Sequence, residues 1–359
     1  TDGTAEAVRE RHPEVRLLRS ATNRGFTGGV RIGAETSESD LLILLNNDAV
    51  PQPGWLEALV RAIDGASGDV VAVGGKIVDD RGERADFVRG AMTFDGHGFQ
   101  PGFRKRLAEV DEPAPGAEIL FACGGNLIAR REDFLRAGGF DDDYFAYLED
   151  VDFGWRSWIA GERVLWEPGA VVRHRSSATS DRLGAFERGV LFERNALQTA
   201  VKNYGDELFP AAVGASFLAA LHRVHRFVVD RNPGTARLRR PPLDEAPIEP
   251  PPSASLLARA ARKLGLRIAS RTPAIDDELT AMQFRAIEWF FRHADRIMAK
   301  RGEVQARRRR SDEEILAKFP ALVVPTYHGD EELMASPLFE AFIARLPHRK
   351  ATLGDMIER

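Results

Sequence analysis

The sequence predicts an α/β sandwich with a mostly parallel sheet over residues 1–180, followed by a helical C-terminal extension. Leu41–Leu45 is a continuous apolar run of strand length, which is typical of a strand covered on both faces. An amphipathic helix is expected at Trp55–Ile63, with Pro53 before its first turn. Val70–Val73 is the next apolar strand. Strands that alternate with helices in this way indicate a parallel sheet covered by helices.

Further elements are expected on both sides of this unit. In order, they are a helix after Thr4, a strand at Val15–Leu18, a helix opened by Gly28 and Gly29, loops over 80–117, a strand at Ile119–Ala129 interrupted by Gly124 and Gly125, a helix at Glu149–Ala160, and short strands at Arg163–Trp166 and Ala170–His174. We therefore interpret residues 1–180 as one α/β domain.

Composition narrows the class of protein. The chain of 359 residues carries 50 Lys and Arg against 54 Asp and Glu, a net charge of −4, so no general basic field indicates nucleic-acid binding. The single cysteine, Cys123, excludes a disulfide framework within the chain and a cysteine-rich metal site. The basic run Arg307–Arg310 is interpreted as a solvated helix end.

Three segments follow the predicted domain. Residues 181–230 are expected to be helical and to pack on it, 231–254 to be a stiff Pro-rich linker, and 255–359 to be a helical extension. Leu208–Leu221 carries no charge and is followed by Arg223 and Arg226. It is too short to cross a bilayer core of about 30 Å. It is either a buried helix or an interfacial helix with a basic flank.

Asn46, Asn47 and Asp48 come directly after the strand at Leu41–Leu45. Ligands of open α/β sheets bind beyond the carboxyl ends of the strands. Carboxylate and amide oxygens suit Mg²⁺ or Mn²⁺. The alternative is a capping turn before Pro51, because Asn and Asp are common turn residues.

Glu149, Asp150 and Asp152 begin a predicted helix whose neighbours are aromatic. A carboxylate in such surroundings can accept a proton from a bound hydroxyl group. The alternative is an acidic first turn that complements the helix dipole. Three weaker signals are His174 at the end of a strand, the small residues around Gly124, and the Gly-rich segment 23–29, which lacks the spacing of known phosphate-binding loops.

The joint order of these motifs resembles the family 2 glycosyltransferases, in particular their rhamnosyltransferase-like branch. The motifs that carry the resemblance are Asn23-Arg24-Gly25-Phe26, Leu44-Leu45-Asn46-Asn47-Asp48-Ala49 with Pro51 and Trp55, Gly138-Gly139-Phe140-Asp141, Phe145-Ala146-Tyr147-Leu148-Glu149-Asp150-Val151-Asp152, and Gly161, Pro168 and His174. The resemblance covers residues 1–180. It implies a GT-A fold, a nucleotide-sugar donor, Mg²⁺ or Mn²⁺, and inversion at the anomeric carbon.

The resemblance also implies roles for single residues. Asp150 stands at the position of the general base, and Glu149 would orient the acceptor or that base. Asp48 would be a metal ligand, since Asn46 replaces the family's first carboxylate, and His174 would complete the metal shell. The residues implied to line the donor or acceptor pocket are Asn23, Arg24, Gly25, Asn46, Asn47, Gly124, Gly125, Asn126 and Trp155.

The expected function is that of an inverting glycosyltransferase acting on a hydroxyl of a cell-surface glycan or lipid-linked precursor. We expect a cytoplasmic protein, and we keep open contact with the inner face of the plasma membrane and homo-oligomers formed through the C-terminal helices. Three alternatives remain: a metal-dependent nucleotidyltransferase, a non-catalytic nucleotide-sugar-binding module, and a scaffold role for 255–359. The family begins with a strand, a helix and a second strand that are not found before Thr1, so the sequence is expected to be a fragment.

Overall fold

The computed structural model describes residues 3–175, 184–231 and 277–357. Its larger strands are β1 (Leu41–Leu45), β2 (Ala49–Pro51), β3 (Val70–Asp79), β4 (Ala85–Phe87), β7 (Asn126–Arg130) and β8 (Arg163–His174). The helices among them are α1 (Thr4–Arg11), α2 (Gly25–Thr36), α3 (Trp55–Asp64), α4 (Arg131–Arg136) and α5 (Glu149–Ile159). Two-residue strands β5 (Ala91–Met92) and β6 (Gly98–Phe99) and 3-10 turns η1 (Leu107–Glu109) and η2 (Asp142–Tyr144) complete this part.

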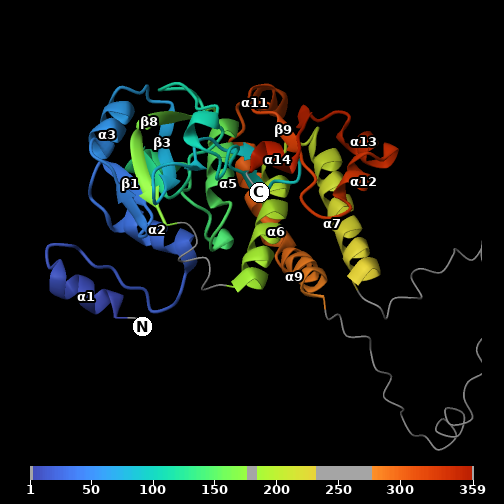
Figure 1. Ribbon diagram of the computed structural model, residues 1–359, viewed down its shortest axis with the longest axis horizontal. Helices are drawn as coiled ribbons and strands as arrows, with labels where there is room; N and C mark the ends of the chain where they lie inside the picture. The colour runs from blue at the N-terminus through green and yellow to red at the C-terminus, as the bar shows by residue number, and fades with distance from the viewer. Residues whose placement is uncertain (1–2, 176–183, 232–276, 358–359) are drawn as a thin grey trace, which may run out of the picture.

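The C-terminal part is mainly helical. Its helices are α6 (Gly184–Asn203), α7 (Phe209–Arg231), α9 (Glu278–Arg292), α10 (Ala294–Ala306), α11 (Asp312–Lys318), α12 (Asp330–Met334), α13 (Pro337–Ile343) and α14 (Leu353–Met356). Strands β9 (Ala321–Val323) and β10 (His348–Lys350) pair with each other. Figure 1 shows the sheet at one end of the molecule and α6, α7 and α9 grouped at the other. The expected α/β part followed by helices is therefore confirmed.

The main sheet is mixed, which corrects the prediction of a mostly parallel one. Its strand order is β1-β7-β3-β8-β2, with β4 paired to β3. β1 and β3 run in the same direction because α3 crosses over between them, and β3 pairs with β8 in parallel. The chain then returns through residues 80–125 and inserts β7 between β1 and β3, antiparallel to both. Thus β1, β3 and β8 present their carboxyl ends at one edge of the sheet.

Helices cover the two faces of the sheet. On one face, Leu59 and Ile63 of α3 pack against Val73 and Ile128. On the other face, the core includes Trp155 of α5 and extends across the chain to the C-terminal helices. Figure 1 shows α3 on the outer side of the sheet and α5 between the sheet and α6. The first residues of α5 therefore lie between the sheet and the C-terminal helices.

Several element boundaries differ from the expected ones. Val15–Leu18 is not a strand, since none of the strands in the described residues pairs with it and Val15 is 51% exposed. The two short strands expected after 162 form one strand, β8, whose pairing with β3 shifts register between Gly75 and Lys76. Residues 80–117 contain three short strands rather than loops alone. The predicted linker 231–254 lies outside the described residues except for Arg231, and so do residues 255–276.

The charge-free run before Arg223 forms most of α7, which contacts α6, α9, α12 and α13. Its basic flank is bound within the protein. Arg223 is only 2% exposed, and its guanidinium lies 3.0 Å from a carboxylate oxygen of Asp330. The buried alternative is therefore favoured for this part of the helix. Among the described helices, none combines the length and apolar character that crossing a membrane requires.

A buried group of charges surrounds this arginine. We call the side chains of Asp95, His97, Glu193, Arg223 and Asp330 the Arg223 cluster; each of its three carboxylates is at most 8% exposed. Arg223 lies 3.4 Å from Asp95, and His97 lies 3.1 Å from Asp95 and 3.4 Å from Glu193. The neighbouring carboxylates hold the pKa of His97 at about 10 despite its burial. The cluster thus joins the loop before β6, α6, α7 and α12.

Candidate active site

Asp48 and His174 meet at the edge where β1 and β8 end. His174 Nε2 lies 3.0 Å from Asp48 Oδ1, and its Nδ1 lies 2.7 Å from Asp86 Oδ2. The three side chains are 12–17% exposed. The pairing of Ala49 with His174 in β2 and β8 fixes this approach. The hydrogen bond and charge of Asp86, with a smaller contribution from Asp48, raise the pKa of His174.

This arrangement fits a divalent metal. A histidine that ligates a metal usually donates its other ring N–H to a carboxylate, which orients the ring. Asp86 accepts at Nδ1, so Nε2 and an Asp48 oxygen face each other as a nitrogen and an oxygen ligand. Within the described ranges no set of three or more His, Cys, Asp or Glu side chains is arranged to hold a metal. Asp48 and His174 are thus the two side chains that face each other as ligands in this arrangement.

Glu149 and Asp150 form the first residues of α5. Asp150 Oδ2 accepts a hydrogen bond from Gly124 N at 3.2 Å. Burial raises the pKa of Asp150 to about 6, although hydrogen bonds from the backbone of Gly124 and Val151 act in the opposite direction. Burial and the charge of Asp150 raise the pKa of Glu149 well above its usual range. Glu149 Oε2 is buried and has no hydrogen-bond partner among the described residues. The start of α5 therefore places two carboxyl groups with raised pKa values side by side.

The turn at Gly124 and Gly125 connects the two halves of this site. Gly124 N binds Asp150, while Gly125 O accepts a hydrogen bond from Asn46 N at 3.2 Å. A Cβ at Gly125 would come within 2.7 Å of the side-chain nitrogen of Asn46, so a larger residue at 125 would require this side chain to move. Asn47 is exposed at the same strand end. The structure thus brings Asn46, Gly124 and Gly125 into one chain of contacts between Asp48 and Asp150.

The segment Asn23–Gly25 lies against the loop that precedes α5. The Asn23 side chain accepts a hydrogen bond from Gly25 N at 3.0 Å, and Arg24 lies 3.8 Å from Asp142. Gly25 has φ +71°, and a Cβ there would come within 2.2 Å of Phe145 O. The predicted pocket residues 23–25 are therefore neighbours of the loop that precedes Glu149 and Asp150.

Two residues expected to line the pocket do not. Asn126 is 0% exposed; its amide nitrogen donates to Lys76 O and Ala170 O, and its oxygen accepts from Trp55 Nε1. Trp155 is also 0% exposed and packs edge-on against Tyr204. Asn126 ties strands together and Trp155 fills the core. An aromatic residue near an acidic motif in sequence need not face the same side of a helix.

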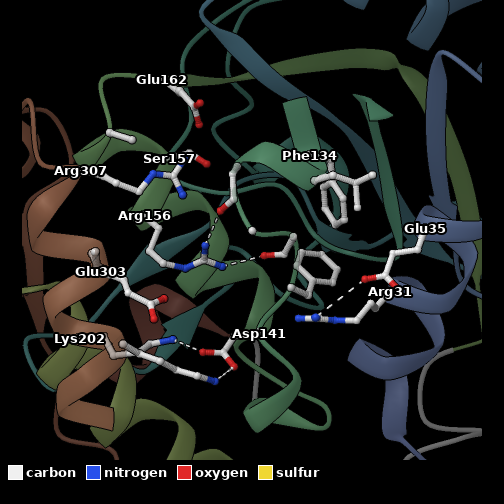
Figure 2. A pocket seen from close by; sticks show the side chains of 18 residues that line it. Arg31, Glu35, Phe134, Asp141, Arg156, Ser157, Glu162, Lys202, Glu303 and Arg307 are labelled. Atoms are coloured by element: carbon white, nitrogen blue, oxygen red, sulfur yellow. Dashed lines mark hydrogen bonds and ion pairs between the residues drawn. The ribbon is translucent and has the colours of Figure 1, made fainter. Parts of the chain in front are cut away.

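A cavity of about 570 Å³ lies elsewhere, between the loop at 137–141 and α10. Its lining includes Arg31, Arg156 and Lys202, but not Asp48, His174 or Asp150. Figure 2 shows Lys202 and Asp141 pointing toward each other in it, 2.7 Å apart. Most of its cationic side chains are already paired with carboxylates or backbone carbonyls. We therefore interpret the cavity as a gap in the packing between the loop at 137–141 and α10.

Sequence reasoning missed Asp86 as a partner of the site. It lies in the segment that was expected to be loop, and no motif distinguishes it from the acidic residues nearby. Only the pairing of β4 with β3 brings it to His174. Asp152 was predicted within the acidic motif; it is 0% exposed and paired with Arg156 and Lys202, which separates it from Glu149 and Asp150.

The stretch of the chain that carries Asp48 and Asp86 matches a known protein family. Residues 1–136 match the family described as "Glycosyl transferase family 2". Residues 1–136 belong to glycosyltransferase family 2. The family 2 domain therefore includes Asp48, Asp86, Gly124 and Gly125, whereas Asp150 and His174 lie beyond the matched stretch. The expected family is confirmed for residues 1–136, and the expected α/β fold is confirmed with the correction that the sheet is mixed.

Curated relatives give more detail. The chain is similar to the N-acetylglucosaminyl-diphospho-decaprenol L-rhamnosyltransferase of Mycobacterium tuberculosis, with 31% identity over 205 residues. That match spans 51% of this chain and 66% of the relative, just under two thirds of its length. The O-antigen biosynthesis protein RfbC of Myxococcus xanthus is 32% identical over 156 residues, 41% of this chain and 12% of that protein.

A solved structure similar to this chain is the mannosyltransferase PcManGT from Pyrobaculum calidifontis in complex with GDP-Man and Mn²⁺. It is 18% identical, with a TM-score of 0.41, and the match covers 82% of this chain and 75% of that one. GalNAc-T7 with UDP, GalNAc and Mn²⁺ is 17% identical, with a TM-score of 0.43, and the match covers 60% of this chain and 42% of that one.

Proposed function

We propose that this protein is an inverting glycosyltransferase that moves a sugar from a nucleotide-sugar donor to a hydroxyl group of a lipid-linked precursor or cell-surface glycan. The observation that carries the proposal is the raised pKa of Asp150 in a half-buried position, one glycine turn away from the Asp48–His174 pair. Membership of family 2 and similarity to a rhamnosyltransferase whose name includes a decaprenol-linked substrate support the transfer and the acceptor class.

In this mechanism Asp150 accepts the proton of the acceptor hydroxyl as its oxygen attacks the anomeric carbon from the face opposite the leaving group. One displacement inverts the configuration and requires no covalent bond to the enzyme. Glu149, whose pKa is raised by its burial and by the charge of Asp150, would orient the acceptor or Asp150. Gly124 and Gly125 provide backbone next to which a sugar can approach closely.

Asp48 and His174 would hold the divalent metal, with Asp86 orienting the imidazole. A bound Mg²⁺ or Mn²⁺ would stabilise the negative charge that develops on the departing nucleoside diphosphate. Asn46 and Asn47, at the same strand end, would bind donor oxygens. The protein's own contribution is to present these groups at the edge where β1 and β8 end.

The proposal is tested by incubating the purified chain with a panel of nucleotide sugars, dTDP-L-rhamnose included, a polyprenyl-diphosphate-linked sugar acceptor, and Mn²⁺. We expect a glycosylated acceptor whose new linkage is inverted relative to the donor, as determined by NMR. Formation of a sugar nucleotide from a sugar phosphate and a nucleoside triphosphate would favour the nucleotidyltransferase alternative. Donor binding without transfer to any acceptor would favour the binding-module alternative.

The raised pKa of Asp150 predicts how the rate of transfer depends on pH. The base acts only when ionised, so turnover should fall about tenfold per pH unit as the pH drops below about 6, and level off above it. Single-turnover rates measured across this range test the prediction. A rate that stays constant through that region would contradict the assignment of Asp150 as base. The residual rate of an Asp150→Asn variant serves as the control, since its profile should lack this inflection.

A further inference from the structure

The loop that leads into α5 has an unusual backbone. Phe145, Tyr147 and Leu148 have φ values of 64°, 70° and 64°, a left-handed region that residues with side chains rarely adopt. Leu148 is the last residue before Glu149. Conformations of this kind persist only where the surrounding structure holds them, and they concentrate at functional sites. Some group must therefore hold this loop in place.

The buried polar face of α6 contacts the loop directly. Asn195 is 0% exposed, and its amide nitrogen lies 3.0, 2.9 and 2.8 Å from the carbonyl oxygens of Tyr144, Ala146 and Tyr147. The Asn195 oxygen accepts a hydrogen bond from Gln198 at 2.9 Å, which orients the amide with its N–H groups toward the loop. The Asn195 side chain thus contacts three carbonyl oxygens of the segment Tyr144–Tyr147.

Two more residues of the same helix face extend this contact. Thr199 lies 2.5 Å from the Tyr144 hydroxyl, and Lys202 Nζ lies 2.7 Å from Asp141 and 3.0 Å from Asp152. Thr199 is 0% and Lys202 1% exposed. Positions 195, 199 and 202 fall on one face of a helix. We call these three residues the α6 clamp.

We propose that the α6 clamp, through Asn195 above all, is a positioning element that holds the strained loop 144–148 and thereby places Glu149 and Asp150 for proton transfer. Asn195 touches no reacting group in this account and acts only through the loop. The inference rests on the proposed function for its catalytic consequence. Its structural claim, that these hydrogen bonds hold the loop, can be tested without any donor or acceptor.

The test compares hydrogen–deuterium exchange in the full chain and in three variants. Asn195→Leu keeps the number and branching of the side-chain heavy atoms and removes both side-chain N–H donors. Leu197→Ala is the matched control, because Leu197 lies on the same helix but packs on the side of Phe290. Thr199→Val is a milder variant that removes one hydroxyl from the α6 clamp. We expect amides 144–150 to exchange on the order of tenfold faster in Asn195→Leu than in Leu197→Ala, with a smaller increase in Thr199→Val.

The single cysteine provides a second readout at the same place. The Cys123 thiol precedes Gly124, whose N–H binds Asp150, and burial together with the charge of Asp150 raises the pKa of this thiol well above the usual range. Displacement of the loop should therefore speed the reaction of this thiol with a disulfide reagent in Asn195→Leu but not in Leu197→Ala. Equal exchange and equal thiol reactivity in the two variants would overturn the proposal. If Asn195→Leu does not fold, unchanged exchange and thiol reactivity in Thr199→Val relative to the parent would overturn it.

Turnover then separates this inference from the proposed function. In an active enzyme, Asn195→Leu should lower kcat by about 10- to 100-fold and leave KM for the donor nearly unchanged, because the metal and donor groups lie on other elements. A merely structural role would lower the folded fraction and leave the kcat of the folded enzyme intact. A parent chain that transfers no sugar would contradict the proposed function, while faster exchange in Asn195→Leu would still support the clamp.

Discussion

Asp150→Asn should lower the rate of sugar transfer by about 10²–10⁴-fold, the usual contribution of a positioned general base. The amide preserves the size of the side chain but does not accept the proton of the acceptor hydroxyl. Affinity for Mn²⁺ should remain close to that of the parent, since Asp48 and His174 lie on other strand ends. Single-turnover transfer rates, together with calorimetric titration of Mn²⁺, measure both quantities on the same variant.

The competing interpretation is that Asp150 only caps α5. Loss of a cap costs about 0.5–2 kcal/mol of stability. The raised pKa of Asp150 leads to the opposite expectation. A carboxyl whose pKa is higher in the folded than in the unfolded protein destabilises the fold increasingly as the pH rises above its unfolded pKa, and the effect is complete once the pH exceeds the folded value, here about 6. The neutral amide should therefore melt at the same or a higher temperature than the parent near neutral pH. A less stable variant with the parent's turnover would show that Asp150 is a cap and not a base.

Asp48→Asn should remove measurable Mn²⁺ binding. Loss of a partner that only orients a ligand typically costs 10- to 100-fold in metal affinity, so loss of a direct charged ligand should cost roughly 100-fold or more. His174→Ala should behave in the same way, and Asp86→Asn should fall between these variants and the parent. Calorimetry and the loss of the free Mn²⁺ electron paramagnetic resonance signal measure the affinity without any sugar donor.

Asp69→Asn is a matched control for this series. Asp69 pairs with Arg163 where β8 begins, at the opposite end of the strand from His174, so its removal changes charge without touching the proposed site. It should bind Mn²⁺ as the parent does. Parent-like affinity in Asp48→Asn would contradict the metal assignment and leave the turn interpretation of residues 46–48.

The sequence predicted the elements whose signals are local. The apolar run Leu41–Leu45, the amphipathic helix of α3 and the start of α5 at Glu149 all occur where they were expected. The direction of β7 was not predictable, because a strand that returns after a long excursion can pair on either side and in either orientation. That single insertion made the sheet mixed. Val15–Leu18 has strand-like composition but no partner strand, and composition alone does not supply one.

In the candidate site, too, residues that stand in local motifs were predicted, whereas residues that act through long-range contacts were not. Asp48 and Asp150 stood in motifs, and the structure connects them through Asn46, Gly125 and Gly124. Asp86 and Asn195 carried no signal in the sequence, because each matters only through a contact over a long sequence separation: 88 residues between Asp86 and His174, and 48 between Tyr147 and Asn195. Asn126 and Trp155 were misassigned for the converse reason, since neighbours in sequence face different sides of an element.

The Arg223 cluster has a consequence for how the chain holds together. Three buried carboxylates face two buried cations, and Asp330 of the C-terminal part supplies the closest of the carboxylates around Arg223. Withdrawal of α12 would leave Arg223 buried with one fewer counter-charge, and a stranded buried charge is strongly unfavourable. Removal of the residues after 276 is therefore expected to destabilise the rest of the chain. We expect these residues and the part of the chain that carries Asp95 and Arg223 to stabilise each other.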